Sequence, residues 1–186
     1  MKKESIKNHL KPYSIIDRRI TTINNAFASA IAPSDEYNEE VLINAIKLLG
    51  QDPQKDLLCV YCGKEAQTWD HVFGLVSEVK FSGYGHVLGN LLPCCQTCNS
   101  RKGNRDWDKY VTSPGDKNLK RKRETAIKQY LKKYLPEKLS YEKIKGICPN
   151  EIQKYESIQN KVIKLMKEAD RLAVTIRAKI KGKRIV

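Results

Sequence analysis

The segments Cys59-Val60-Tyr61-Cys62 and Cys95-Gln96-Thr97-Cys98 decide the fold, because each places two thiols three residues apart. A tight turn brings sulfurs at this spacing onto one side of the chain, and two such pairs complete a tetrahedron around one ion. Four sulfur ligands favour Zn²⁺ and leave no open position for a substrate water, so we expect a structural ion. The 32 residues between the pairs are too many for a compact zinc ribbon, which indicates a functional segment between them.

Two cysteines fall outside this pattern. Cys94 directly precedes Cys95 and is interpreted as a small buried residue, with replacement of Cys95 as a ligand as the alternative. Cys148 has no partner three residues away and is interpreted as a core or surface thiol. A disulfide framework is typical of exported proteins, and nothing near the N-terminus has the apolar core of a signal peptide. The spacing therefore favours metal binding over disulfides.

Polar motifs lie between the cysteine pairs and just after them. Trp69-Asp70-His71-Val72 is followed by a glycine-rich stretch and then by Asn90-Leu91-Leu92-Pro93. The second cysteine pair continues into Asn99-Ser100-Arg101-Lys102, where we expect a helix to begin. The order of these motifs resembles that of the HNH endonuclease family: Cys-x-x-Cys, then Asp-His, then Asn-Leu-x-Pro, and then Cys-x-x-Cys-Asn-x-x-Lys. Each residue alone has an ordinary structural explanation, and only the ordered combination is specific.

The resemblance implies a fold of the α+β class. We expect a small ββα-metal nuclease module, braced by zinc and flanked by N- and C-terminal α-helices, in a chain that is mostly α overall. Asp70 and His71 would lie on the first strand, Asn90 at the second, and Asn99 near the start of the helix.

The resemblance also implies a role for each site residue. Asp70 and Asn99 would hold one Mg²⁺ or Mn²⁺, because hard cations prefer carboxylate and amide oxygens. His71 would be the general base that takes a proton from the attacking water, since imidazole titrates near neutral pH. Asn90 would tie down the loop and orient His71, and Lys102 would meet the phosphate. DNA cleavage would then leave a 5′-phosphate and a 3′-hydroxyl.

Three positions depart from the family pattern. Asn99 replaces the usual histidine but still offers an oxygen or nitrogen ligand, and Gly74 stands where a proline often follows the Asp-His pair. His86 has no assigned family role, so a structural or DNA-contacting histidine and a metal ligand are both open. Trp69 and Trp107 are interpreted as packing around the zinc module, with stacking on a base as the alternative.

Apolar spacing predicts two helices before this module. Apolar residues three and four apart predict one helix over residues 14–31, and Pro33 ends it. A second helix follows, with Ser34 and Asp35 as N-cap candidates and Gly50 in the position of a C-terminal cap. We assign residues 1–55 to an N-terminal helical region and residues 56–112 to the HNH module with its four-cysteine zinc site.

Residues 113–186 are predicted to form a basic C-terminal helical region that binds DNA, dimerises or does both. Ser113-Pro114-Gly115 reads as a turn or linker, followed by a basic helix over about 117–135. The last helix, about 151–179, either docks on the protein's own helices or forms a homodimer contact, because it has a heptad seam. The seam consists of Tyr155, Ile158, Val162, Leu165, Ala169, Leu172 and Ile176.

Charge is distributed unevenly along the chain. Residues 1–100 contain 10 Lys and Arg against 11 Asp and Glu, a net of −1, and residues 101–186 contain 25 against 10, a net of +15. Clustered basic residues favour a polyanion, and double-stranded DNA is the leading candidate. No apolar run approaches the roughly 20 residues that span a bilayer, so we expect a cytoplasmic protein without a membrane partner.

Three classes of function fit these observations. The first is a metal-dependent HNH endonuclease, of a restriction or other defence type. The second is a non-catalytic, zinc-stabilised nucleic-acid-binding protein, and the third is a structural RNA-binding or ribosome-associated protein. The second and third have no need of Asp70, His71 and Asn99, so these residues favour the first.

Overall fold

The computed structural model describes residues 3–77, 80–103, 105–111 and 116–183. The chain forms two compact units. The terminal unit comprises residues up to Phe27 and from Ile144 onward, and the central unit comprises Ala28–Lys143. The predicted linker Ser113-Pro114-Gly115 and the 112/113 boundary lie outside the described residues. The described chain is mostly helical, with a small region of two sheets, as the α+β prediction with mostly α content expected.

The terminal unit is helical. Its elements are η1 (Lys3–Ser5), α1 (Ile6–His9), most of α2 (Ile15–Ala30) and α8 (Pro149–Lys183). The central unit contains α3 (Glu39–Leu48), β1 (Thr68–His71), β2 (Val76–Ser77), β3 (Lys80–Phe81), η2 (Leu88–Asn90), β4 (Leu91–Cys94), α4 (Gln96–Lys102), α5 (Trp107–Tyr110) and α6 (Lys117–Tyr134). Residues of α7 (Tyr141–Ile147) belong to both units.

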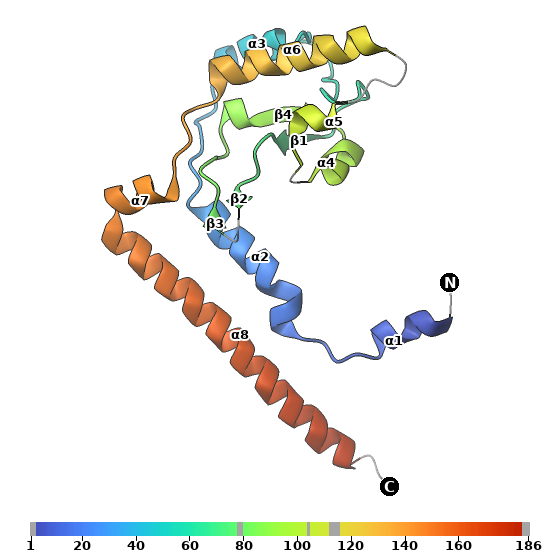
Figure 1. The fold of residues 1–186 in the computed structure, drawn as a ribbon, viewed down its shortest axis with the longest axis vertical. Coiled ribbons are helices and arrows are strands. Elements are labelled where there is room, and N and C mark those ends of the chain that lie inside the picture. Colours follow the sequence, from blue (N-terminus) through green and yellow to red (C-terminus); the bar gives the residue numbers. More distant parts are fainter. Residues whose placement is uncertain (1–2, 78–79, 104, 112–115, 184–186) are drawn as a thin grey trace. The chain divides into compact units, whose positions relative to one another are not determined.

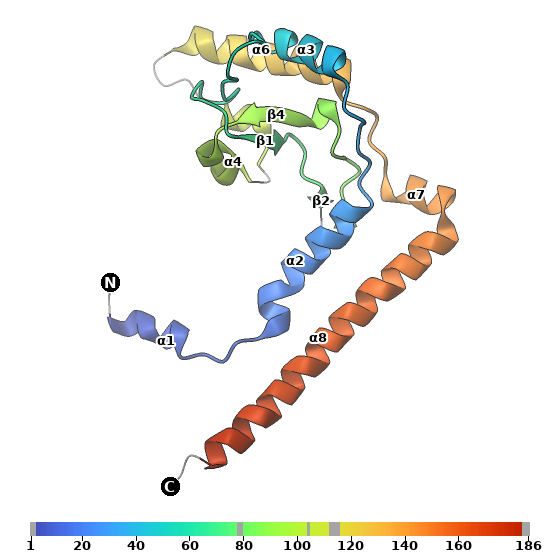
Figure 2. The same ribbon diagram turned by 180° about the vertical axis from the view of Figure 1, so that it is seen from behind.

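The central unit is built around a strand–strand–helix arrangement. β1 pairs antiparallel with β4, and the register sets Asp70 opposite Leu92 and His71 opposite Leu91. α4 follows β4 directly and contacts β1. Figures 1 and 2 show the β1–β4 pair between α4 and the helix α6, which lies beside α3. The short strands β2 and β3 form a separate antiparallel sheet.

The long helices follow the apolar spacing of the sequence. α2, α6 and α8 confirm the predicted helices, although α8 extends beyond the predicted range at both ends. The predicted N-caps of α3 were wrong, because Asn38 caps this helix by accepting a hydrogen bond from the Val41 N–H. Ser34 instead forms a backbone bridge with His86. Asp35, three residues before the N-cap, accepts the Leu88 N–H at 2.7 Å.

The core of the central unit joins the strands to α6. Tyr130 of α6 is buried, and its hydroxyl donates hydrogen bonds to the carbonyls of Leu88 and Leu91, on either side of Asn90. Gly89 permits this approach, since a Cβ there would collide with the Tyr134 backbone. The buried cluster comprises Ala45, Cys59, Val60, Tyr61, Val72, Leu92, Cys94, Cys95, Cys98, Val111, Ile127 and Tyr130. The cysteines therefore belong to the core itself.

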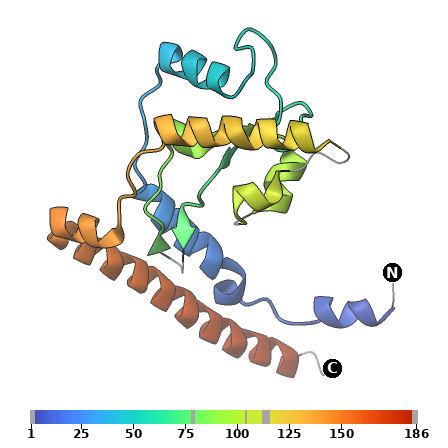
Figure 3. The ribbon, with the colours of Figure 1, turned by 45° about the horizontal axis from the view of Figure 1, so that its top comes forward.

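Side chains of α8 hold α2 in the terminal unit. The Tyr155 hydroxyl donates to the Phe27 carbonyl at 2.9 Å, and Gln159 donates to Asn24 at 3.0 Å. The Asp170 carboxylate accepts the N–H groups of Ile15 and Ile16 at the start of α2, and these hydrogen bonds lower the pKa of Asp170. The two helices run side by side in the views of Figures 2 and 3. Asp170 thus satisfies N–H groups that have no partner within the helix.

Bilayer crossing needs a helix that is both long and apolar, and the part of the chain that the structure describes contains none.

Candidate active site and metal centre

The four predicted zinc ligands form one cluster. The sulfurs of Cys59, Cys62, Cys95 and Cys98 all lie within 4.8 Å of one another. Zinc–sulfur bonds of about 2.3 Å in a tetrahedron separate the sulfurs by about 3.8 Å. The Cys62 and Cys95 sulfurs are 3.8 Å apart, so this cluster could hold a metal ion such as zinc. Cys95 also caps α4, because its sulfur accepts the Cys98 N–H.

Cys94 lies outside the cluster, as predicted. Its side chain is buried, and its thiol donates to the Cys95 carbonyl. A second contact joins its sulfur to the Cys59 sulfur at 3.9 Å, and this hydrogen bond lowers the pKa of Cys59 to about 4. Burial instead raises the pKa of Cys62 and Cys98. Binding of a cation by all four sulfurs must therefore release protons from the cluster.

Asp70 belongs to a buried network beneath the strand pair. One carboxylate oxygen, Oδ2, accepts the Tyr61 hydroxyl at 2.6 Å and lies 3.0 Å from the Lys102 ammonium. The other, Oδ1, accepts from Lys102 at 3.3 Å. Side chains of all three residues are almost fully buried. This site is closed to bulk water. Burial and the neighbouring Asp70 raise the pKa of Tyr61, so its hydroxyl stays protonated and donates to the carboxylate.

The position of Lys102 corrects the expectation that it meets phosphate. Only 2% of Lys102 is exposed, and its ammonium also donates to the His71 carbonyl at 2.9 Å. Lys102 therefore ties α4 to the end of β1 and neutralises Asp70. Tyr61 is a member of this network that no sequence motif identified. Its location between the two cysteines of the first pair was visible, but its burial was not.

His71 lies on the opposite face of β1 from Asp70. Successive side chains of a strand point to opposite faces, so Trp69 and His71 lie outside while Asp70 lies inside. Trp69 is 41% exposed, which differs from the expected packing role. The His71 Nε2 atom lies 3.1 Å from the His86 Nδ1 atom, and the two rings are 5.0 Å apart. Burial and the neighbouring His86 lower the pKa of His71, so its imidazole is neutral at pH 7.

Asn90 connects the loops that hold the two histidines. Its amide oxygen accepts the Phe73 N–H at 2.9 Å, and its amide nitrogen donates to the carbonyls of Phe73 and Gly85, each at 3.0 Å. The side chain is fully buried. Because Phe73 is two residues beyond His71 and Gly85 directly precedes His86, Asn90 holds both segments together. The expected loop-tying function of Asn90 has these contacts as its structural basis.

We expect Asn90→Ala to lower the free energy of unfolding by about 1–3 kcal/mol, because three buried backbone groups lose their partner. The midpoint of urea unfolding measures this loss. Asn160→Ala, at an exposed position of α8, is the matched control and should change stability by less than about 0.5 kcal/mol. Equal effects of the two substitutions would show that the Asn90 hydrogen bonds do not stabilise the loops.

Asn99 is the fourth residue of α4 and is half-buried. Residues three apart lie on the same side of a helix, so Asn99 and Lys102 share the side that contacts β1. The structure thus brings Lys102 to Asp70 at the interface of α4 and β1, with Asn99 about one helical turn earlier on α4. His71 and His86 lie at the surface end of β1, on the other face of the strand.

A cleft of about 630 Å³ adjoins the loop that follows His71. Its lining includes the stacked rings of Phe73 and Tyr84, whose centroids are 4.5 Å apart, and the α5 residue Trp107. The lining also contains the basic residues Arg105, Lys109 and Lys138 and the acidic residues Asp106 and Asp108. Aromatic rings beside basic groups are typical of surfaces that bind nucleotides.

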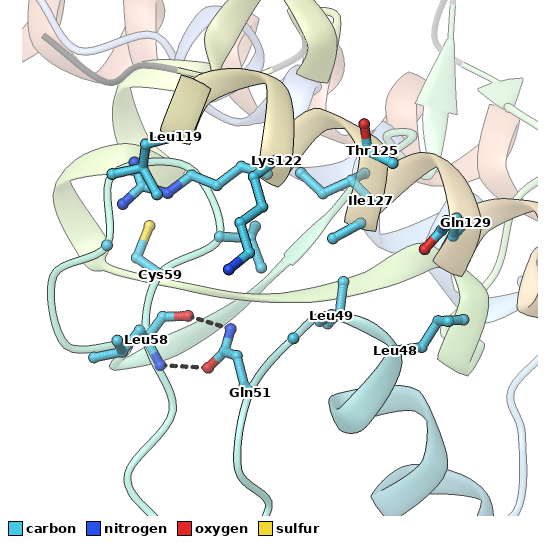
Figure 4. A pocket seen from close by; sticks show the side chains of 15 residues that line it. Leu48, Leu49, Gln51, Leu58, Cys59, Leu119, Lys122, Thr125, Ile127 and Gln129 are labelled. Carbon is cyan, nitrogen blue, oxygen red and sulfur yellow. Dashed lines mark hydrogen bonds between the residues drawn. The ribbon is translucent and has the colours of Figure 1, made fainter. Parts of the chain in front are cut away.

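A second cavity, of about 530 Å³, lies on the α3 and α6 side of the cysteine cluster. Figure 4 shows Cys59 and Leu58 facing Leu119 and Ile127 of α6, with paired hydrogen bonds between Gln51 and Leu58. Its lining is mainly apolar and includes none of the predicted catalytic residues. We therefore place the candidate active site at His71 and not in this cavity.

Comparison of the chain with family models, with curated proteins and with solved structures gives no match. The assignment of a function therefore depends on the geometry and chemistry of the site alone.

Proposed function

We propose that the protein is a metal-dependent HNH-type endonuclease that hydrolyses phosphodiester bonds of double-stranded DNA, with His71 as the general base. One observation supports this most strongly. A neutral imidazole stands at the surface end of β1, in a ββα arrangement within the unit that contains the four-cysteine cluster; its ring contacts His86, and its backbone carbonyl accepts from Lys102. The restriction or defence role is part of the same proposal and has no separate support.

His71 has the properties that a general base requires. Its lowered pKa keeps the ring neutral at pH 7, so it can accept a proton from water. In the tautomer in which Nε2–H donates to His86 Nδ1, the other ring nitrogen, Nδ1, is the proton-accepting atom. The Lys102 ammonium donates to the His71 carbonyl, and the Asn90 side chain accepts the Phe73 N–H two residues further on. These two hydrogen bonds fix the backbone that positions the His71 ring.

Asp70 and Asn99 would hold the divalent cation. Asp70 is buried on the inner face of β1, and both of its carboxylate oxygens contact Lys102, so Lys102 would have to move away from Oδ1 before a cation could bind there. Asn99 lies on the side of α4 that faces β1 and offers an amide oxygen, a ligand that suits Mg²⁺ or Mn²⁺. When bound, such an ion offsets negative charge on the phosphate and on the leaving oxygen.

Basic side chains of the central unit would bind the DNA backbone. α6 contains eight Lys and Arg residues against one Glu. Its buried side contains Ile127 and Tyr130, whereas Lys117, Arg121, Lys128 and Lys132 are exposed. These four residues are four, seven and four positions apart, so they lie on one face of the helix. Phosphates that lie along this face would release counterions, and binding would weaken as salt rises.

A non-catalytic nucleic-acid-binding protein is the second candidate, because the cysteine cluster and the basic face of α6 would serve it equally. Such a protein needs no neutral imidazole at its surface. Cleavage of DNA distinguishes the endonuclease from this candidate and also from an RNA-binding structural protein, because neither of these would cut DNA.

We expect the purified protein to cut or nick plasmid DNA with Mg²⁺ or Mn²⁺, and we expect His71→Ala to slow cleavage by roughly 10²–10⁴-fold. The substituted protein should keep its metal content and its affinity for DNA, because His71 contributes to neither in this proposal. His9→Ala is the matched control, since His9 is exposed on α1 in the terminal unit and should leave the rate unchanged. An unchanged rate in His71→Ala would exclude His71 as the base.

A further inference from the structure

The helix α8 has two apolar faces, of which only one is used within the terminal unit. The side that bears Tyr155, Gln159 and Asp170 contacts α2. A neighbouring stripe contains Ile158, Leu165, Leu172 and Ile176, each of which is more than half exposed, with Leu165 at 64%. Long apolar side chains exposed in a row are unusual on a soluble protein and indicate a contact surface.

The stripe has the spacing of a coiled-coil seam. Ile158, Leu165 and Leu172 are seven residues apart and occupy one heptad position, while Val162, Ala169 and Ile176 occupy the other; Tyr155, one heptad before Val162, contacts α2, so the open part of the seam begins at Ile158. Val174 lies between Leu172 and Ile176 in the sequence but outside the stripe, because two residues turn the helix by about 200° and place it on a different face. Only a partner helix of similar length would cover the stripe continuously.

We infer that α8 pairs antiparallel with α8 of a second copy of this chain. In an antiparallel coiled coil, Val162 of one copy packs against Leu165 of the partner subunit, and Ile158 packs against Ala169 of the partner subunit. The same register places Lys161 beside Glu168 of the partner subunit. Twofold symmetry makes each of these contacts twice, so a surface that matches itself in this way fits a second copy of the same helix.

Charge selects the antiparallel direction. Parallel pairing would set Lys161 against Met166 of the partner subunit, so neither Lys161 nor Glu168 would face an opposite charge. It would also bring together two C-terminal ends that each contain Arg177, Lys179, Lys181 and Lys183. Antiparallel pairing moves these ends apart and brings each toward the first turn of the partner helix, which contains Glu151. This inference uses the terminal unit alone and does not depend on the nuclease proposal.

Sedimentation equilibrium of the full chain, without DNA, tests the contact. We expect a dimer whose dissociation constant rises roughly 30-fold or more in Leu165→Glu, because the substitution places two charges in the apolar seam. Val174→Glu is the matched control: Val174 is 58% exposed, and its change should leave the constant within about twofold. Circular dichroism should be unchanged in both variants, since both positions are exposed. A monomeric wild-type protein at about 100 μM, where even a weak specific dimer would form, or a Leu165→Glu variant that dimerises normally would overturn the inference.

Charge exchange tests the direction. Lys161→Glu and Glu168→Lys should each weaken the dimer at low salt by roughly two- to fivefold, because each creates two like-charge contacts. The double variant restores opposite charges in the antiparallel register and should dimerise as the wild type does. If the single variants dimerise normally, or if the double variant is no better than either, the antiparallel register is wrong.

Discussion

Removal of the metal from the four-cysteine cluster is expected to unfold the central unit. The cysteines are part of the same buried cluster as Tyr61 and Leu92, and they join the segment before β1 to the start of α4. Structural zinc sites of this kind contribute about 10 kcal/mol or more of apparent binding free energy, which exceeds the net stability of many domains. Without the ion, four thiols would have to pack in a core shaped for a tetrahedral centre.

Metal analysis and thermal unfolding measure this effect. We expect about one zinc per chain, and we expect a strong chelator or Cys98→Ser to abolish the cooperative thermal transition of the central unit. Cys148→Ser is the matched control, because Cys148 lies outside the cluster and should leave zinc content and unfolding unchanged. Because binding releases protons from the cluster, the affinity for zinc should fall as pH decreases. Protein that contains no metal and still folds would rule out this role for the cysteines.

Lys102→Met is expected to lower the free energy of unfolding by about 3–5 kcal/mol. The methionine replaces the methylene chain of Lys102 but leaves the Asp70 carboxylate buried with the Tyr61 hydroxyl as its partner. A buried charge without its counterion is costly because the surroundings screen it poorly. The His71 carbonyl also loses a donor, so the end of β1 should become less ordered.

Chemical denaturation with a matched ion pair measures the cost. Lys109→Met removes the same cation from the exposed pair of Lys109 and Asp106, whose atoms are 2.6 Å apart, and should change stability far less than Lys102→Met, because water screens an exposed pair. A Lys102→Met/Asp70→Asn double variant should recover part of the loss, because no uncompensated charge is then buried. If Lys102→Met and Lys109→Met have equal effects, the buried network contributes little to stability.

The arrangement of β1 explains why the network and the proposed base are separate. Adjacent residues of a strand face opposite sides, so Asp70 and His71 cannot both point inward. Asp70 takes part in the buried contacts that join β1 to α4, and His71 stays accessible at the surface. The Asp70 carboxylate therefore contacts Lys102 and Tyr61, whereas burial and the neighbouring His86 are the main causes that lower the pKa of His71.

Features that depend on residues close together in the chain were predictable. Apolar spacing located α2, α6 and α8, since the period of a helix is set by residues three and four apart. Two Cys-x-x-Cys motifs identified the members of the cluster, because a tight turn brings such sulfurs together whatever the surrounding fold. The N-cap of α3 was missed, because Ser34, Asp35 and Asn38 are all good caps and local propensity does not choose among them.

Contacts between distant segments required the folded chain. Asp70 and Lys102 are 32 residues apart, and only the packing of α4 on β1 shows that Lys102 is a buried partner of Asp70 and not a phosphate ligand. Likewise, two sets of contacts bring His86 against His71. One is the backbone bridge between Ser34 and His86, and the other is the pair of Asn90 contacts with Phe73 and Gly85. Local sequence does not predict such burial and pairing. They arise when polar groups from several segments are buried together and each needs a hydrogen-bond partner.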